Sequence, residues 1–154
     1  MHKNRIMHTQ KMVSVLGIFP SSDDRTSLKQ IVRHSKWNLG MVEALRPARP
    51  LIDELAAGVV ISDSHLPDAC WQDVLRELQC RRFEPVLIVA SRLADDALWA
   101  EVLNLGGSDV LAMPLQEREV LRSVSLAWRQ WQDRLVTGER PAGKVITAGA
   151  RAWW

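Results

Sequence analysis

The sequence predicts an α/β fold of three layers, in which a five-stranded parallel sheet lies between helices on both faces. Strand-like and helix-like segments alternate five times along the chain, which is the pattern of parallel strands joined by helical crossovers. The run at residues 85–90 is apolar on both faces, as a central parallel strand should be. With 154 residues, of which 47% are hydrophobic and 25% charged, the chain suits one globular domain.

The first half of the chain contains three of the expected strands, at residues 13–19, 39–44 and 59–62. Ser21 or Ser22 can cap a helix that follows the first strand, with Asp23 and Asp24 in its first turn. Apolar residues at helical spacing extend this helix to about residue 37. The segment at residues 46–50 should break the chain, and Pro50 suits the first turn of a short helix that ends at Gly58.

The second half continues the alternation. A helix should begin near Cys70, a strand should cover residues 85–90 with Ser91 in its exit loop, and a helix from Asp95 to Leu105 should end at two glycines, at positions 106 and 107. A short strand at residues 109–112 precedes a last helix over residues 117–134. The apolar stripe of that helix predicts packing against the core, and it consists of Val120, Leu121, Val124, Ala127, Trp128 and Trp131.

Composition limits the other classes of protein. We expect a flexible leader over residues 1–12, one folded domain over residues 13–134 and a flexible tail over residues 135–154 that ends in Trp153 and Trp154. No apolar run approaches the roughly 20 residues of a membrane helix, and a net charge of +2 from scattered charges does not favour nucleic-acid binding. Cys70 and Cys80 flank a predicted helix, too far apart for a disulfide, so we expect reduced thiols in a cytoplasmic protein.

Asp63 is the one credible reactive group. It is the first carboxylate after the strand at residues 59–62, and Pro67 keeps the following loop short. The carboxyl ends of parallel strands form the crevice in which open α/β sheets bind ligands. A strand-end Asp can also simply cap a loop, and His65 is expected to face solvent without binding a metal.

Several of these segments together resemble the receiver domain of two-component response regulators. The resemblance covers roughly residues 13–134, and it rests on Asp63, Leu66-Pro67, the strand at 85–90, residues 104–111 and Met113-Pro114. It implies the flavodoxin-like, CheY-like strand order 2-1-3-4-5 with five helices.

The resemblance also implies a function. In that family the strand-three Asp, here Asp63, accepts a phosphoryl group from a histidine kinase or phosphotransfer protein. Formation of an acyl phosphate calls for Mg²⁺ to offset negative charge, and Mg²⁺ calls for further carboxylates. Asp23 and Asp24, with Asp63, are the candidate metal ligands, although both acids come about three residues later than the family's acidic pair.

Three positions depart from the family pattern. Phe19-Pro20 stands where the acidic pair should follow the first strand, Ala90 stands for the Thr or Ser that contacts the phosphoryl group, and Met113 stands for the Lys. Ser91, one residue after Ala90, should point to the other side of the sheet. Met has neither a charge nor a strong donor with which to bind a phosphoryl oxygen.

Three hypotheses for function follow. The first is a stand-alone receiver of a phosphorelay that accepts a phosphoryl group on Asp63 and signals through a downstream protein. The second is a pseudo-receiver that binds proteins independently of phosphorylation. The third is a phosphatase with an aspartate nucleophile, which His65 disfavours because such folds want a carboxylate there; we therefore expect no enzyme.

Trp71 and Trp99 are candidates for an exposed apolar patch. Trp99, Trp128 and Trp131 are candidates for a homodimer face built from the fourth helix, the fifth strand and the fifth helix of the predicted fold.

Overall fold

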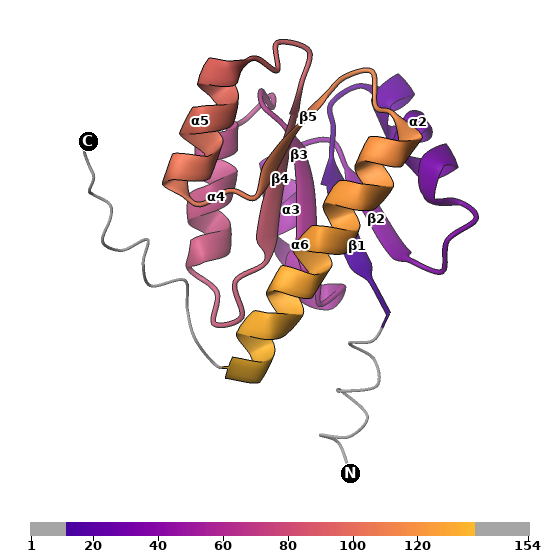
Figure 1. Cartoon of the computed structure of the whole chain (residues 1–154). Helices are drawn as coiled ribbons and strands as arrows, with labels where there is room; N and C mark the ends of the chain where they lie inside the picture. The colour runs from indigo at the N-terminus through magenta and orange to yellow at the C-terminus, as the bar shows by residue number, and fades with distance from the viewer. Residues whose placement is uncertain (1–11, 138–154) are drawn as a thin grey trace.

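One parallel sheet forms the centre of the molecule (Figure 1). The computed structural model describes residues 12–137. Its strands are β1 (Ser14–Ile18), β2 (Asn38–Val42), β3 (Val59–Asp63), β4 (Val86–Ser91) and β5 (Asp109–Ala112). They lie in the order β2-β1-β3-β4-β5, and every neighbouring pair is parallel. The predicted fold class and strand order are confirmed.

Helices cover both faces of this sheet, labelled as in Figure 1. They are α2 (Ser22–Val32), α3 (Leu45–Glu54), α4 (Trp71–Gln79), α5 (Asp96–Leu105) and α6 (Glu117–Thr137). One hydrophobic cluster joins the sheet to α2 and α6, and a second joins it to α3, α4 and α5. The three layers therefore enclose two separate cores.

The central strand β3 contributes to both cores. Val59 and Ile61 belong to the cluster beneath α2 and α6, whereas Val60 belongs to the opposite cluster. Successive side chains of a strand point to opposite faces, so Asp63, two residues after Ile61, lies on the α2/α6 side. Asp63 therefore lies where the carboxyl ends of the parallel strands meet, which we call the carboxyl edge of the sheet.

Most helix ends follow from local sequence. The Ser21 hydroxyl accepts a hydrogen bond from the Asp23 N–H (3.2 Å), and the Asp95 carboxylate accepts one from the Leu98 N–H (2.9 Å). Gly106 ends α5 with a φ of 119°, a conformation that glycine adopts at low cost. Cys70 precedes α4 and Cys80 follows it, as predicted, and both are free thiols.

The end of α2 differs from the prediction. We expected the helix to reach about residue 37, but it ends at Val32. The Ser35 hydroxyl donates to the Val32 carbonyl (2.6 Å) and accepts from the Trp37 N–H (3.2 Å). A serine side chain that bonds to nearby backbone competes with helix, so the chain turns here and β2 begins at Asn38.

The prediction for α3 was wrong at its start. The segment expected to break the chain is the first half of the helix, and Pro50 lies inside it rather than in its first turn. Pro50 removes one backbone hydrogen bond. That loss is tolerated because Leu45, Ala48 and Ile52 are buried on one side of the helix, where packing outweighs local propensity.

Two further boundaries also shift. Ser91 belongs to β4, paired with Ala112, and not to the exit loop. The last helix continues to Thr137, three residues beyond the expected end. The predicted leader and tail, including Trp153 and Trp154, fall almost wholly outside the described residues. No helix within residues 12–137 has the length and apolar character needed to cross a membrane.

For Trp128 and Trp131 the predicted packing of the last helix against the core is confirmed, and the alternative of an exposed surface is wrong for them and for Trp71. Trp71 lies in the core beneath α4, while Trp128 and Trp131 lie in the core beneath α6. Periodicity shows that such residues share a face of a helix, but the direction of that face depends on the sheet against which the helix packs. Trp99 alone of the four is exposed.

Candidate functional site

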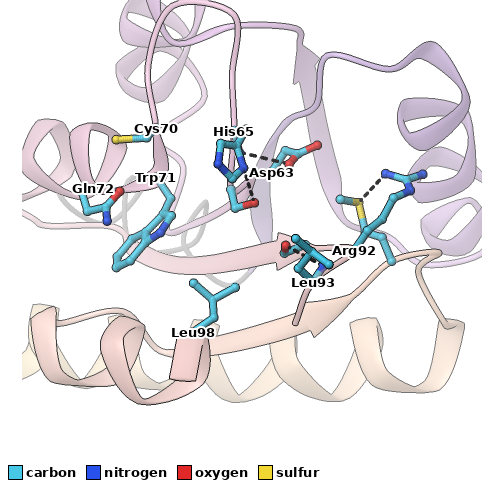
Figure 2. Close-up of a pocket in the computed structure, with 11 residues that line it drawn as sticks. Asp63, His65, Cys70, Trp71, Gln72, Arg92, Leu93 and Leu98 are labelled. Carbon is cyan, nitrogen blue, oxygen red and sulfur yellow. Dashed lines mark hydrogen bonds between the residues drawn. The ribbon is translucent and has the colours of Figure 1, made fainter. Parts of the chain in front are cut away.

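The carboxylate of Asp63 stands at the end of β3, half-buried, and opposite Ala90 of β4. Its Oδ1 accepts a hydrogen bond from the N–H of His65 (3.2 Å; Figure 2). This bond is of the local kind with which an Asp stabilises a loop. One oxygen of Asp63 is thus engaged by its own loop, while the side chain still borders a cavity.

That cavity, which we call the Asp63 pocket, has a volume of about 360 Å³ and opens at the carboxyl edge of the sheet. It combines polar groups from the ends of β3 and β4 with apolar groups from α4, α5 and the end of β5 (Figure 2). Its lining residues are Asp63, Ser64, His65, Cys70, Trp71, Gln72, Ser91, Arg92, Leu93, Leu98 and Met113. The predicted crevice therefore exists, at the strand ends where it was expected.

The loop between β3 and α4 is held by its own hydrogen bonds. The N–H of Leu66 donates to the Ala69 carbonyl (2.8 Å), and the N–H of Trp71 donates to the Ser64 carbonyl (3.2 Å). The His65 ring lies 3.1 Å from the Ser64 hydroxyl through its Nδ1. These contacts fix the position of Asp63 relative to α4.

The two departures at β4 and β5 lie where the sequence suggested. Ala90 is fully buried and pairs with Asp63, and Met113, directly after β5, is also buried. Both belong to the hydrophobic cluster beneath α2 and α6, on the same side of the sheet as Asp63. The positions that would contact a phosphoryl group in the family thus carry apolar side chains that extend the core.

Ser91 lines the Asp63 pocket but does not stand at the family's hydroxyl position. It follows Ala90 along β4, so its side chain points to the opposite face. Its hydroxyl accepts a hydrogen bond from the Leu93 N–H (3.0 Å). This contact shapes the turn after β4.

The end of β1 is also apolar. Phe19 is fully buried, its N–H donates to the Val42 carbonyl (2.9 Å), and Pro20 follows on the surface. No carboxylate therefore stands directly after β1. Asp23, in the first turn of α2, is exposed.

Asp24 has a different role from the one expected. Its carboxylate is buried and forms a two-pronged ion pair with Arg92, with Oδ1–Nη2 at 2.9 Å and Oδ2–Nη1 at 3.2 Å. Burial of a carboxylate is costly unless it is paired. Asp24 is therefore committed to Arg92 and is not free to bind a cation.

The predicted metal site, composed of Asp63, Asp23 and Asp24, is not assembled. Within residues 12–137 there is no group of three or more His, Cys, Asp or Glu side chains placed to hold a metal ion. Mg²⁺ prefers carboxylate oxygens and water in an octahedral arrangement. An apolar Phe19 and an Asp24 already paired with a guanidinium do not fit that requirement.

Arg92 is the site residue that sequence reasoning missed. It begins the loop after β4, lines the Asp63 pocket and also approaches the Met113 sulfur (Nη1–Sδ 3.8 Å). Its pKa lies above the ordinary arginine value, first because Asp24 accepts its hydrogen bonds and attracts its charge, and to a smaller extent because Asp63 also attracts it. The sequence offered one signal, a basic residue directly after a buried strand at the predicted crevice.

Comparison with known proteins identifies the fold. Among solved structures, the chain is similar to the signal receiver domain of a protein described as a Luxo repressor from Vibrio parahaemolyticus, with a TM-score of 0.75, 22% identity, and coverage of 84% of this chain and 99% of that one. The chain has the receiver-domain fold.

Other solved structures agree. The receiver domain of an HD domain-containing protein from Pseudomonas fluorescens Pf-5 matches with a TM-score of 0.71 and 20% identity, over 79% of this chain and 98% of that one. The chemotaxis response regulator CheY4 of Vibrio cholerae matches with a TM-score of 0.67 and 15% identity, over 75% and 98%. No protein-family model and no curated protein matches the sequence. The receiver fold is thus retained here around an edge whose side chains differ from the family pattern.

Proposed function

We propose that this protein is a receiver-type signalling module that acts by binding other proteins and does not depend on phosphorylation of Asp63. The observation that carries this proposal is the Asp24–Arg92 ion pair. It occupies the carboxyl edge of the sheet, where a phosphoacceptor site would need carboxylates free for a cation. The receiver fold supports a role in two-component signalling, because solved structures with this fold are described as signal receiver domains and as a chemotaxis response regulator.

Electrostatics favour this proposal over phosphotransfer. An acyl phosphate at Asp63 would add negative charge at a position where residues 12–137 bring together no group of three or more side chains able to hold a cation that offsets it. Charge-assisted hydrogen bonds are worth about 1.5–3 kcal/mol each, and a two-state switch needs about 5.5 kcal/mol of differential stabilisation. With alanine and methionine at positions 90 and 113, two such hydrogen bonds to a phosphoryl group cannot form. The free energy available to shift the protein between two states on phosphorylation is therefore smaller.

The surface of α5 is the candidate for partner binding. Leu93, Trp99 and Leu105 are large apolar residues exposed on and beside this helix, and we call them the α5 face. Large apolar side chains exposed to solvent can mark interaction sites; Trp99 and Leu105, six residues apart in the helix, lie on different sides of it, so Trp99 is the residue to test first. We propose this face as the contact for a downstream protein or for a second copy of the chain.

A phosphoacceptor role for Asp63 is the second candidate. It is favoured by the half-buried carboxylate at the end of β3, which borders an open pocket. A histidine kinase or phosphotransfer protein would then be the donor. In this version Arg92 would provide the one positive charge among the residues that line the pocket.

Two measurements on one pair of proteins separate the candidates. The wild-type chain and Asp63→Asn are incubated with acetyl phosphate and Mg²⁺ and examined by intact mass spectrometry, and both are tested for signalling in the cell of origin. We expect no adduct on the wild type and unchanged signalling by Asp63→Asn. An adduct on the wild type that Asp63→Asn lacks, together with lost signalling, would establish the phosphoacceptor role instead.

A further inference from the structure

Arg92 connects two parts of the molecule that are remote in sequence. It follows β4, whereas its partner Asp24 lies in the first turn of α2, and the two meet at the edge that also carries Asp63. The Asp24 side chain is only 8% exposed, while the Arg92 side chain is 57% exposed. The carboxylate is therefore the fixed partner, and the guanidinium reaches it from solvent.

The geometry of the pair suits a permanent charge. A guanidinium presents a planar fork of donors that matches both oxygens of a carboxylate, and both oxygens of Asp24 are engaged. Arginine also stays protonated at all physiological pH values. The positive charge is consequently present at this edge whatever the conditions, and it lies within the electrostatic influence of Asp63 as well.

We propose that Arg92 is a built-in counter-ion that takes the place of a divalent cation at the Asp63 pocket and excludes such a cation from it. This inference goes beyond the proposed docking function, because it concerns the ligand chemistry of the pocket and holds whichever partner binds. Without the guanidinium, the buried Asp24 carboxylate would lose its partner, and Asp63 would lose the positive charge that borders the same pocket. Mg²⁺ is commonly bound by one or two carboxylates with water completing its shell, so loss of the Arg92 charge should create an affinity for it.

The test uses Arg92→Gln, which removes the charge but keeps a polar side chain. The ¹⁵N-labelled wild type and variant are titrated with Mn²⁺, whose paramagnetism broadens nearby amide resonances, and their thermal unfolding is measured with and without saturating Mg²⁺. We expect no selective broadening and no thermal shift in the wild type. In Arg92→Gln we expect broadening at Asp63 and Asp24 and a rise of roughly 3 °C in the unfolding midpoint with Mg²⁺.

Two controls make the result specific. Arg129→Gln removes an exposed arginine from α6 and should behave as the wild type. Asp24→Asn/Arg92→Gln removes both charges, and it should lose the response to the cation because one carboxylate is gone.

Each result of these titrations supports or overturns the exclusion of a divalent cation by Arg92. Selective Mn²⁺ broadening at Asp63 in the wild type would overturn the proposal, because Arg92 would then not exclude the ion. An Arg92→Gln protein that shows no broadening, or that fails to fold and is not rescued by Mg²⁺, would reduce Arg92 to an ordinary ion-pair partner. A variant that folds only when Mg²⁺ is added would support the proposal. Signalling plays no part in these readouts, so their outcome is independent of the docking function.

Discussion

Single side chains decide the character of the sheet edge. Phe19, Ala90 and Met113 are buried and apolar where polar or charged groups stand in the family pattern. Each of these residues extends the hydrophobic cluster beneath α2 and α6, so the fold loses nothing by the exchange. The polar contacts of the family pattern have no counterpart at these three positions, and Asp63 and the Asp24–Arg92 pair are the charged groups that the structure places near them.

At Gly58 close packing leaves no room for a side chain. A Cβ built on Gly58 would lie 2.6 Å from Trp128 and 2.6 Å from Trp131, two rings that pack at a centroid distance of 4.8 Å. Because both rings are buried, we expect Gly58→Ala to lower the free energy of unfolding by about 1–3 kcal/mol. Urea unfolding would measure the change. Ser125→Ala, on the exposed face of α6, should change stability little, and an equal loss in both variants would contradict this explanation.

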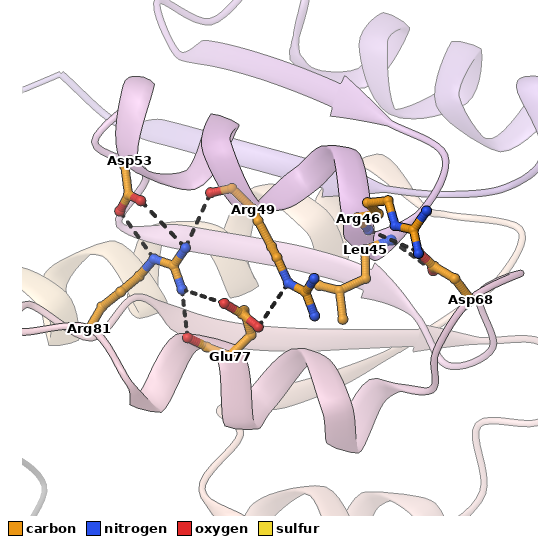
Figure 3. A network of polar contacts seen from close by, with 7 residues as sticks. All are labelled: Leu45, Arg46, Arg49, Asp53, Asp68, Glu77 and Arg81. Carbon is orange, nitrogen blue, oxygen red and sulfur yellow. Dashed lines mark hydrogen bonds and ion pairs between the residues drawn. The ribbon is translucent and has the colours of Figure 1, made fainter.

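The loop between β3 and α4 is connected to α3 through Asp68. The residue before α3 is Ala44, which has no side chain able to cap the helix. Asp68 supplies the cap from the loop after β3: its Oδ1 accepts from the Leu45 N–H (3.0 Å) and its Oδ2 from the Arg46 N–H (2.9 Å; Figure 3). These two bonds hold the pKa of Asp68 below its usual value, Leu45 first and Arg46 second.

Loss of this cap should destabilise the protein in a way that depends on pH. We expect Asp68→Ala to lower the free energy of unfolding at neutral pH by about 1 kcal/mol. Because the pKa of Asp68 is lower in the folded state, its ionised carboxylate stabilises the fold fully above the unfolded-state pKa. This stabilisation is lost as the pH falls through the folded-state pKa. The gap between wild type and variant, measured by urea unfolding, should therefore narrow in acid. Asp133→Ala, an exposed carboxylate late in α6, is the control, and a gap that widened in acid would refute the capping role.

The helices α3 and α4 are also joined by a polar network (Figure 3). Arg81 donates to the Asp53 carboxylate (3.1 Å) and to the Glu77 carbonyl (2.6 Å), and Arg49 donates to Glu77 (3.0 Å). Arg81 is the most buried cation of the set, with 17% of its side chain exposed. The remaining charges are more exposed and contribute little individually. The network therefore adds orientation to a contact that the buried apolar residues already stabilise.

For the whole molecule, the α5 face is the surface whose role can be tested directly. Trp99 is 49% exposed, whereas Trp128 and Trp131 are buried, so Trp99 is the tryptophan through which a homodimer on this face would form. If the face joins two copies, Trp99→Ala should weaken association by 10-fold or more, since a buried aromatic contact is typically worth over 1.4 kcal/mol. Light scattering over a concentration series would show it. Unchanged association in Trp99→Ala, with Arg122→Ala on α6 as the matched surface control, would exclude a dimer through Trp99.

The sequence by itself determined the class of the fold and the position of Asp63. Alternation of strands and helices, the apolar run at β4 and the glycine at the end of α5 are local signals, because each depends on side-chain periodicity or on the conformation of a single residue. The predicted C-terminal end of α2 and the predicted start of α3 were wrong. At α2 the Ser35 hydroxyl bonds to the neighbouring backbone, which helical periodicity alone does not show. At α3 Asp68 caps the helix from a position 23 residues away, which no local signal contains.

Only the tertiary structure decided what surrounds Asp63. Asp24 and Arg92 are separated by 68 positions in the chain, and neither residue alone indicates a partner. The fold places the first turn of α2 next to the end of β4, which brings the two side chains together. Because the Asp24 carboxylate is buried, it requires a cationic partner at that point. The stripe with Trp128 and Trp131 was predicted to pack against the core, and the structure confirms this. For Trp71, the packing of α4 against the sheet decided between core and surface.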